Sequence, residues 1–305
     1  MINLNAKIIG KYRLVINKAD GTEEDTGWFN NLILNQGLDR LGSSPTNQIV
    51  SSVQIGTGTS TPANTQTGLD AYTAGVSGTN SASTYINSGS PNYATTLTYV
   101  YTFAQGAVVG NMSEVGVGWA TSGNYLFSRA LILDTLGNPT TLTLIALDQL
   151  TVYYSVEIIP PLIDSTGTVT LSSIVYNYTI RTAYAGSFGQ IPELLTSSQY
   201  FSSPYAIIPY AAGATLGAIT TGPIGTSGTT GTAVASTYTS GNYYLDGTYT
   251  LSITQGNVSG GIQCLLLTYG YTYSPIQFQV YFTSPIPKDN TKALTLTLRF
   301  SWSRG

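Results

Sequence analysis

Hydrophobic and polar residues alternate along several stretches of this chain, which is the pattern of a β-strand with one buried face. Alternation is clearest in residues 294–302, where Leu, Phe and Trp occupy the even positions and Thr, Arg and Ser the odd ones. Residues 96–103 show the same pattern, with a leucine, two tyrosines and a phenylalanine on one side. We therefore predict half-buried strands at both places and expect the chain to end inside a sheet.

Other stretches predict an all-β fold with little helix. Further strands are expected at residues 12–17, 112–119, 124–133, 140–147, 150–159, 249–254, 261–269 and 276–283. Residues 27–41 are ambiguous, because Leu34, Leu38 and Leu41 have helical spacing that Gly37 interrupts. We interpret this segment as a strand that runs into a short helix. Stretches rich in Gly, Ser and Thr, above all residues 183–241, predict long loops.

A weak internal repeat suggests that one β unit occurs twice. Residues 105–110 match residues 255–260 at a Gln-Gly pair, a valine and a glycine, and matches upstream and downstream keep the same order. Pro160-Pro161 would end the first unit, because proline cannot donate to a central strand ladder. We therefore expect two tandem β-sandwich-like domains, residues 1–162 and 163–305, the second a repeat of the first.

The composition is poor in charge. Charged residues make up 8% of the 305 residues, against about 25% in ordinary globular proteins. Ten of them lie within residues 1–40, and Tyr alone occurs 23 times. A neutral, polar surface suits permanent contact with other subunits or with sugars. We therefore expect a stable homo-oligomer.

Several partner classes and compartments are disfavoured. A net charge of −3 provides no basic field for nucleic acid, and no apolar run approaches the roughly 18 residues of a membrane span. The first residues lack the pattern of a signal peptide, so we expect synthesis in the cytoplasm. Cys264 is the single cysteine; it cannot form an internal disulfide and is expected to be buried.

The residue types needed for common catalytic chemistry are missing. The chain has no histidine, which removes the commonest general base and metal ligand, and one cysteine cannot form a zinc site. The glycines of residues 56–59 lack the lysine of a phosphate-binding loop. A glycosidase needs only two carboxylates, but the candidates stand in no motif: Glu114, Asp134, Asp148, Glu157 and Asp246. We expect no enzyme activity, no cofactor and no metal.

One structural ion pair is predicted from strand register. A four-residue turn at residues 120–123 would pair Trp119 with Asn124, and each step outward pairs residues whose numbers sum to 243. Glu114 then lies opposite Arg129, where opposite charges attract. The alternative is that both side chains point to solvent and never meet.

Tyrosines in the expected loops have two interpretations. They could stack on sugar rings or pack against a neighbouring subunit, or they could fill the protein's own core and rim. The tyrosines concerned are Tyr72, Tyr85, Tyr93, Tyr205, Tyr210, Tyr238, Tyr243 and Tyr244.

Four motifs follow one another in the first half of the chain: the WFNNLILNQGLD run at residues 28–39, IGTGT at 55–59 with Pro62, EVG at 114–116, and LFSRALI at 126–132. In this order they resemble virion structural proteins of tailed bacteriophages, which are described as tail-fiber or tail-appendage proteins. The resemblance covers about residues 10–160. It implies a non-catalytic homo-oligomer, a trimer being one option, that binds other phage tail or capsid proteins or touches the host surface, including a surface glycan.

The resemblance leaves the place in the virion open. A tail fiber or fiber-attachment component is the first interpretation, with release from the host by lysis. A capsid decoration (cement) protein is the alternative. A cell-surface adhesin is the third, weakened by the missing signal peptide.

Overall fold

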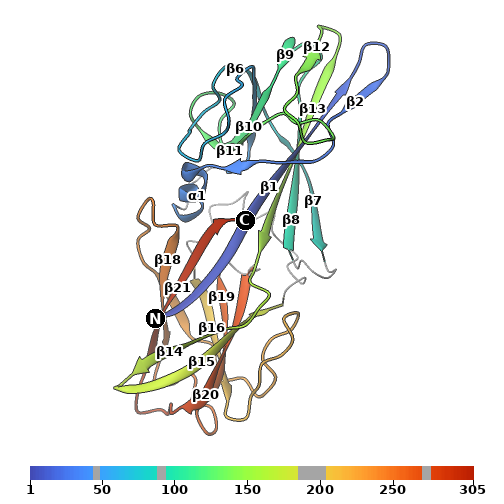
Figure 1. The fold of residues 1–305 in the computed structure, drawn as a ribbon. Helices are drawn as coiled ribbons and strands as arrows, with labels where there is room; N and C mark the ends of the chain where they lie inside the picture. Colours follow the sequence, from blue (N-terminus) through green and yellow to red (C-terminus); the bar gives the residue numbers. More distant parts are fainter. Residues whose placement is uncertain (44–48, 88–93, 185–203, 270–275) are drawn as a thin grey trace.

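The computed structural model describes residues 1–43, 49–87, 94–184, 204–269 and 276–305 (Figure 1). These residues form 21 strands and one helix, so the all-β fold is confirmed. The strands expected at residues 96–103 and 294–302 are present, with their Leu, Tyr, Phe and Trp side chains turned inward. The ambiguous segment is two short strands, β3 (Phe29–Asn30) and β4 (Leu32–Ile33), followed by helix α1 (Asn35–Gly42).

The longest described strand, β1 (Ile2–Asn17), runs through both halves of the molecule (Figure 1). Its later part pairs antiparallel with β13 (Gln149–Ile159), and its first part pairs parallel with β21 (Leu294–Arg304). Residues 1–162 and 163–305, called the N-terminal and C-terminal halves below, therefore share one sheet of nine strands. The remaining members are β8 (Ala94–Thr102) and β7 (Thr79–Asn87) beyond β13, β18 (Tyr244–Leu251) and β17 (Thr232–Ala235) beyond β21, and β2 (Glu23–Asp25) and β3 on β1.

Each half adds a five-stranded sheet of its own. In the N-terminal half the order is β4, β11 (Leu126–Leu131), β10 (Glu114–Gly118), β5 (Ser52–Gly56) and β6 (Tyr72–Ser77). In the C-terminal half it is β14 (Ser165–Leu171), β15 (Ile174–Ala183), β20 (Ile276–Ile286), β19 (Ile262–Tyr269) and β16 (Pro204–Ala211). A ribbon of β9 (Gly110–Met112) and β12 (Leu142–Leu144) extends the N-terminal half.

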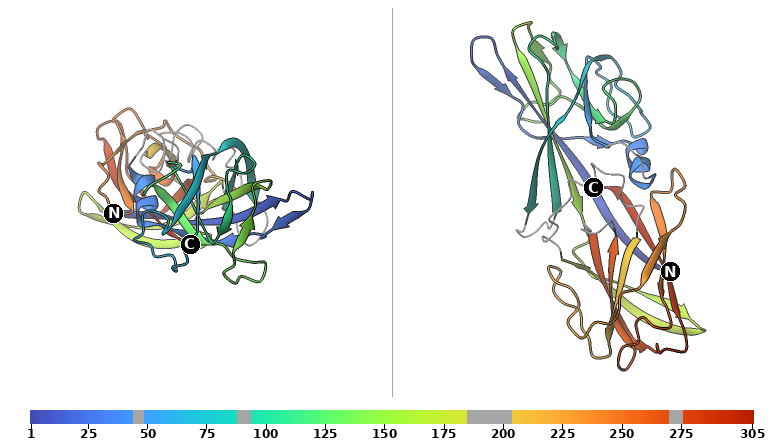
Figure 2. Two further views of the ribbon diagram at one scale, coloured as in Figure 1. Left: turned by 90° about the horizontal axis from the view of Figure 1, so that it is seen from above. Right: turned by 180° about the vertical axis from the view of Figure 1, so that it is seen from behind.

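Both five-stranded sheets pack on the same face of the shared sheet. Even-numbered residues of β1 are buried from Ile2 to Ile16, whereas Asn3, Asn5 and Lys7 are exposed. The buried residues of both halves form one hydrophobic cluster. Figure 2 shows the halves following one another along β1. Because no loop interrupts β1 between the two halves, the sheet itself holds them in line.

The strands of the two halves follow the same order. In the N-terminal half the hairpin β7–β8 of the shared sheet is followed by the hairpin β10–β11 of the half's own sheet, and β13 then returns to pair with β8. In the C-terminal half the corresponding elements are the hairpin β17–β18, the hairpin β19–β20 and the strand β21, which pairs with β18. Residues 105–119 and 255–269 both follow that first hairpin, where Gly106 and Gly256 adopt φ values of 74° and 67°. The difference is the first strand: β14 lies at an outer edge, and β1 takes the place beside β21.

Helix α1 fastens the two halves at a second place. Asp39 accepts hydrogen bonds from the Tyr238 hydroxyl at 2.7 Å and the Gly241 N–H at 2.6 Å, and the Trp302 indole N–H donates to the Leu38 carbonyl at 2.8 Å. A side chain at Gly37 would collide with the Phe127 carbonyl, so glycine lets the helix approach β11. The segment of residues 37–39 therefore contributes to the joint between the halves.

Candidate functional site

The structure brings Glu114 and Arg129 together in a fully buried ion pair. Glu114 begins β10 and Arg129 lies in β11, and both side chains are 0% exposed. The Arg129 Nε donates to Glu114 Oε2 at 2.9 Å, and Nη2 lies 2.8 Å from the same oxygen. In a protein so poor in charge, this pair is the most deeply buried of the described ion pairs.

The register from which the pair was predicted was wrong by two residues. Gly116, rather than Glu114, lies directly opposite Arg129, and Glu114 lies opposite Leu131. Arg129 therefore reaches Glu114 diagonally, as long side chains on one face of a sheet do. Gly116 itself packs against Leu126 and Leu69, whose side chains leave no room for a Cβ at that position.

Two separate slips of one residue explain the shift. The turn is one residue longer than expected, because the Trp119 N–H donates to the Tyr125 carbonyl at 3.1 Å. A bulge between Val117 and Gly118 adds a second residue. One slip would turn each side chain to the other face of the sheet, but two restore the face. The acid and the base therefore still share one side.

The ion pair anchors the loop of residues 57–71. Glu114 Oε1 accepts hydrogen bonds from the Gly58 and Ala71 N–H groups at 2.9 and 2.8 Å, and Oε2 accepts one from Asp70 N–H at 3.1 Å. Arg129 donates to Gln66 Oε1 at 2.6 Å and to Asp70 Oδ2 at 2.7 Å. Almost every hydrogen-bonding position of the pair is thus satisfied, which buried charges require.

Asp70 is held in its charged form by the same network. A hydrogen bond from the Ser60 hydroxyl, together with the nearby Arg129 guanidinium, lowers the pKa of the Asp70 carboxyl despite partial desolvation. A side chain at Gly58 would collide with the Glu114 carboxylate. The absence of a side chain at Gly58 therefore allows the Glu114 carboxylate to pack against this loop.

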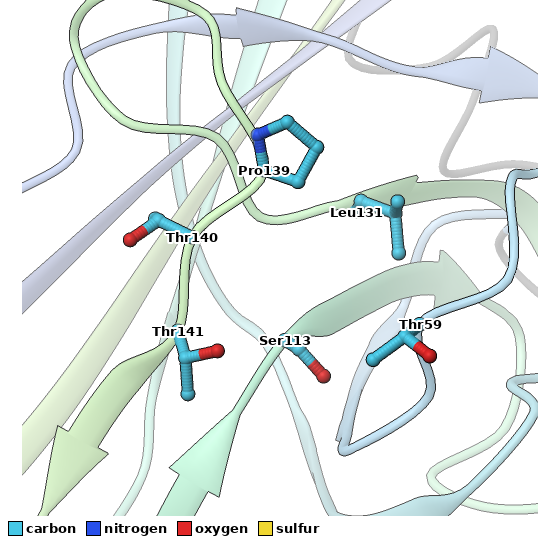
Figure 3. Close-up of a pocket in the computed structure, with 6 residues that line it drawn as sticks. All are labelled: Thr59, Ser113, Leu131, Pro139, Thr140 and Thr141. Atoms are coloured by element: carbon cyan, nitrogen blue, oxygen red, sulfur yellow. The ribbon is translucent and has the colours of Figure 1, made fainter.

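A pocket of about 230 Å³ opens beside the anchored loop (Figure 3). Its lining is Thr59, Ser113, Leu131, Pro139, Thr140 and Thr141. One wall is the loop held by the ion pair. The Ser113 hydroxyl, which also lines the pocket, donates to the Gly58 carbonyl of that loop at 2.9 Å. Pro139 and Thr140 line the pocket directly after a turn in which Asp134 accepts the N–H groups of Leu136 and Asn138 at 2.9 Å. The lining carries hydroxyls and apolar groups but no charge.

A second, wider pocket of about 480 Å³ lies near the tip of β1. It is bordered by Lys18 and Asp148, whose carboxylate is 3% exposed and accepts the N–H groups of Ala19 and Ile145 at 3.0 and 2.9 Å. Asp148 is thereby used to fix the backbone around the pocket.

The other carboxylates considered for catalysis are dispersed through the fold. Glu157 pairs with Lys11 at 3.1 Å, and Asp246 pairs with Arg299 at 2.7 Å on the outer face of the shared sheet. Cys264 is buried as expected, and burial raises the pKa of its thiol to about 12. Among the described residues no group of three or more His, Cys, Asp or Glu side chains is placed to bind a metal.

Sequence reasoning missed Gln279 on β20. Its side chain is 0% exposed, its Oε1 accepts the Gly217 N–H at 2.8 Å, and its Nε2 lies 3.1 Å from the carbonyls of both Ala218 and Thr221. Gln279 thus anchors the loop after β16, as Arg129 anchors the loop after β5. A neutral amide within a strand gives no signal of such a role.

The tyrosines expected in loops include some that pack within the chain and one that is exposed. Tyr238 stacks on Trp302 at the joint, with ring centroids 5.7 Å apart, and Tyr244 lies under Arg299. Tyr72 is 47% exposed. The side chains of Tyr85, Tyr93 and Tyr205 lie outside the described residues.

No helix in the part of the chain that the structure describes is both long and apolar enough to cross a membrane. Comparison with protein-family models, with curated proteins and with solved structures finds no match to this chain.

Proposed function

We propose that this chain is a structural protein of a bacteriophage virion, a tail fiber or fiber-attachment component that acts as a homo-oligomer and has no enzymatic role. The observation that carries the proposal is the continuous sheet through both halves. A single strand, β1, belongs to both, so the protein is one elongated body without a hinge in that strand. Such a body suits a part that transmits position and force within a particle.

The surface supports association with other copies. Leu136, Ile163 and Val234 are 84%, 86% and 67% exposed, and charged residues make up only 8% of the chain. Exposed apolar groups and low charge both favour contact between proteins. Partners in this proposal are further copies of the chain and other phage tail or capsid proteins.

Contact with a host-surface glycan is a further part of the proposal. The pocket at Thr59 offers hydroxyl groups beside the apolar surfaces of Leu131 and Pro139, which suits a neutral sugar ring. The Glu114–Arg129 pair holds one wall, and Asp134 fixes the turn that precedes Pro139, so little ordering is needed when a ligand binds.

We also propose that the two halves are β-sandwich-like domains that arose by tandem duplication, with the boundary between residues 162 and 163. The common strand order and the paired glycines at positions 106 and 256 support this. Superposition of the two halves in an experimental structure tests it: residues 105–119 should overlie residues 255–269.

Immunogold electron microscopy of purified phage particles tests the function. Antibody raised against the recombinant protein should label the tail, and mass spectrometry should find the chain in the same particles. Label spread over the head would favour the capsid decoration protein. Particles without the chain would overturn the proposal.

A further inference from the structure

In the part of the chain that the structure describes, the hairpin of β14 and β15 leaves one edge of the C-terminal sheet unpaired. Among the described residues β14 pairs with β15 alone, and β15 pairs with β20 only from Tyr178 onward. The end of the hairpin therefore projects past the sheet (Figure 1). Ser172 and Ser173 form its two-residue turn with φ values of 47° and 66°.

This edge lacks the features that normally prevent edge strands from pairing. Lysines, prolines and inward charges protect such strands in natural proteins. Residues 165–177 contain no charged residue and no proline, and Ile174 and Val175 are 54% and 60% exposed. An open, uncharged edge with seven residues in a strand is a template for another strand.

Thr166 and Thr170 of β14 stand at equal distances on either side of Thr168. Thr166, Thr168 and Thr170 are exposed and share one face, whereas Gly167 and Val169 face the other way. If two copies pair antiparallel about Thr168, each Thr168 lies opposite the other, and Thr166 lies opposite Thr170 of the second copy. In this register, even-numbered residues lie opposite even-numbered residues and odd-numbered opposite odd-numbered. Side chains of one parity share a face, so the buried faces of both sheets lie on the same side.

We propose that β14 pairs with β14 of a second copy across a twofold axis at Thr168, which joins two five-stranded sheets into one of ten. A second copy fits better than a foreign strand, because two identical strands related by a twofold axis can form an antiparallel ladder with matching hydrogen-bond donors and acceptors. β14 carries no charge that would repel the same strand of the second copy. Threonine pairs across such strands are favourable.

The proposal rests on the homo-oligomer proposed above and names its contact. A twofold contact gives assemblies with an even number of copies. It therefore departs from the trimer that the phage resemblance allows.

Oxidative crosslinking tests the register. In the full chain, Thr168→Cys should give a disulfide-linked dimer, since opposite residues of antiparallel strands lie about 4.5–5.5 Å apart, within disulfide reach. Thr166→Cys alone should give none, but T166C/T170C should crosslink. The unaltered protein is the control, because its single cysteine, Cys264, is buried and should form no crosslink. No dimer from Thr168→Cys, or equal crosslinking from Thr166→Cys, would overturn the pairing.

Light scattering after gel filtration tests the assembly. Thr168→Lys places two lysines face to face and should halve the measured mass. Thr297→Lys, at an exposed position of the interior strand β21, is the matched control and should leave the mass unchanged. An oligomer whose mass survives Thr168→Lys would overturn this contact but leave the virion role intact. A particle without the chain would overturn that role even where the crosslink forms.

Discussion

In the N-terminal half a buried arginine holds the loop after β5, and in the C-terminal half a buried glutamine holds the loop after β16. Arg129 lies opposite Gly116, and Gln279 lies opposite Leu266, at matching places in hairpins of the same order. Arg129 needs Glu114 as its counter-ion; the corresponding position in the C-terminal half is Cys264, a small neutral residue. The same fold therefore supports two chemical means of fixing a loop.

The difference shows that a buried charge brings its partner with it. A guanidinium without water must be paired, so acid and base occur together or not at all. An amide can satisfy N–H and carbonyl groups while it remains neutral. The charged version makes more bonds to side chains, whereas Gln279 bonds only to backbone atoms. This leads us to expect a stiffer loop in the N-terminal half, and a larger penalty when its anchor is lost.

The halves also differ in how they are completed. β1 pairs antiparallel with β13 in the N-terminal half, but the C-terminal half takes the first residues of that same strand to cover β21. The N-terminal half thus contains its own first strand, and the C-terminal half depends on it.

The largest expected effect follows from removing residues 1–6. Ile2 and Leu4 are buried against the C-terminal core, and truncating one such side chain typically costs about 2–5 kcal/mol. We expect a loss of about 5 kcal/mol or more in the free energy of unfolding of the C-terminal half. Hydrogen exchange should quicken in β18 and β21 while β10 and β11 stay protected.

The full-length variant N3A/N5A is the control, because both asparagines are exposed. It should behave as the unaltered protein. If the truncated chain protects β21 fully, the C-terminal half is self-sufficient and the comparison between the halves is mistaken.

Arg129→Gln should cost about 3–5 kcal/mol, because it leaves the Glu114 carboxylate buried without a cation. The double variant E114C/R129Q places at these two positions the residue types found in the C-terminal half, Cys and Gln. It also removes the buried Glu114 carboxylate that Arg129→Gln leaves unpaired. We expect urea unfolding to show the double variant more stable than Arg129→Gln alone. A double variant that is less stable than the single one would show that the two solutions are not interchangeable.

Alkali should weaken the N-terminal half through Tyr12, Tyr101 and Tyr154. Burial raises the pKa of each phenol, so the folded state keeps protons that the unfolded chain releases near pH 10. Their contribution is complete below about pH 10 and falls above it, by about 1.4 kcal/mol per pH unit for each tyrosine. Urea unfolding between pH 8 and 11.5 measures this slope.

Tyr12→Phe should reduce the alkaline slope by the share of one tyrosine. An unchanged slope in Tyr12→Phe would mean that Tyr12 ionises as freely in the folded protein as in the unfolded chain.

Gln279→Met should cost less than Arg129→Gln, about 1–3 kcal/mol. Methionine has a similar shape but leaves the Gly217 N–H and several carbonyls unpaired, and no charge is stranded. Urea unfolding gives the comparison. A penalty equal to that of Arg129→Gln would show that the bonds to the loop, rather than the charge, set the size of the effect.

Local sequence predicted the position of many strands, but it did not predict which strands pair with one another. The alternation of β21 correctly identified its buried leucines, Phe300 and Trp302. Ile2, Leu4 and Ala6 alternate in the same way with polar residues, yet the strand was predicted to begin at Tyr12. Pairing between the two ends of the chain depends on packing of the whole molecule, which no local pattern carries.

The site shows the same limit. Opposite charges in a predicted hairpin indicated Glu114 and Arg129 as an ion pair. The sequence did not predict the length of the turn or the bulge at Gly118, so the predicted register was wrong. Gln66 and Asp70, which complete the network, come from a loop without periodicity. Such residues are placed by the buried charge that needs them rather than by any pattern of their own.

The smallest expected effects concern two partly exposed ion pairs, one in each half. Arg13 binds Asp25, with its guanidinium 5.4 Å from the centre of the Tyr153 ring, and Arg299 binds Asp246 over Tyr244 at 3.5 Å. Exposed pairs contribute about 0–1 kcal/mol, and stacking on an aromatic ring adds about 0.5–1 kcal/mol.

Replacement by lysine keeps the charge but loses the flat, two-pronged guanidinium. We expect Arg299→Lys to lower the free energy of unfolding by about 1 kcal/mol and Arg13→Lys by about half of that, because the Arg299 stack is closer. The difference should persist in 1 M salt, which screens the ion pairs but leaves the ring contacts. Equal effects that vanish together in salt would show that only the ion pairs contribute, and that the two halves do not differ on this face of the sheet.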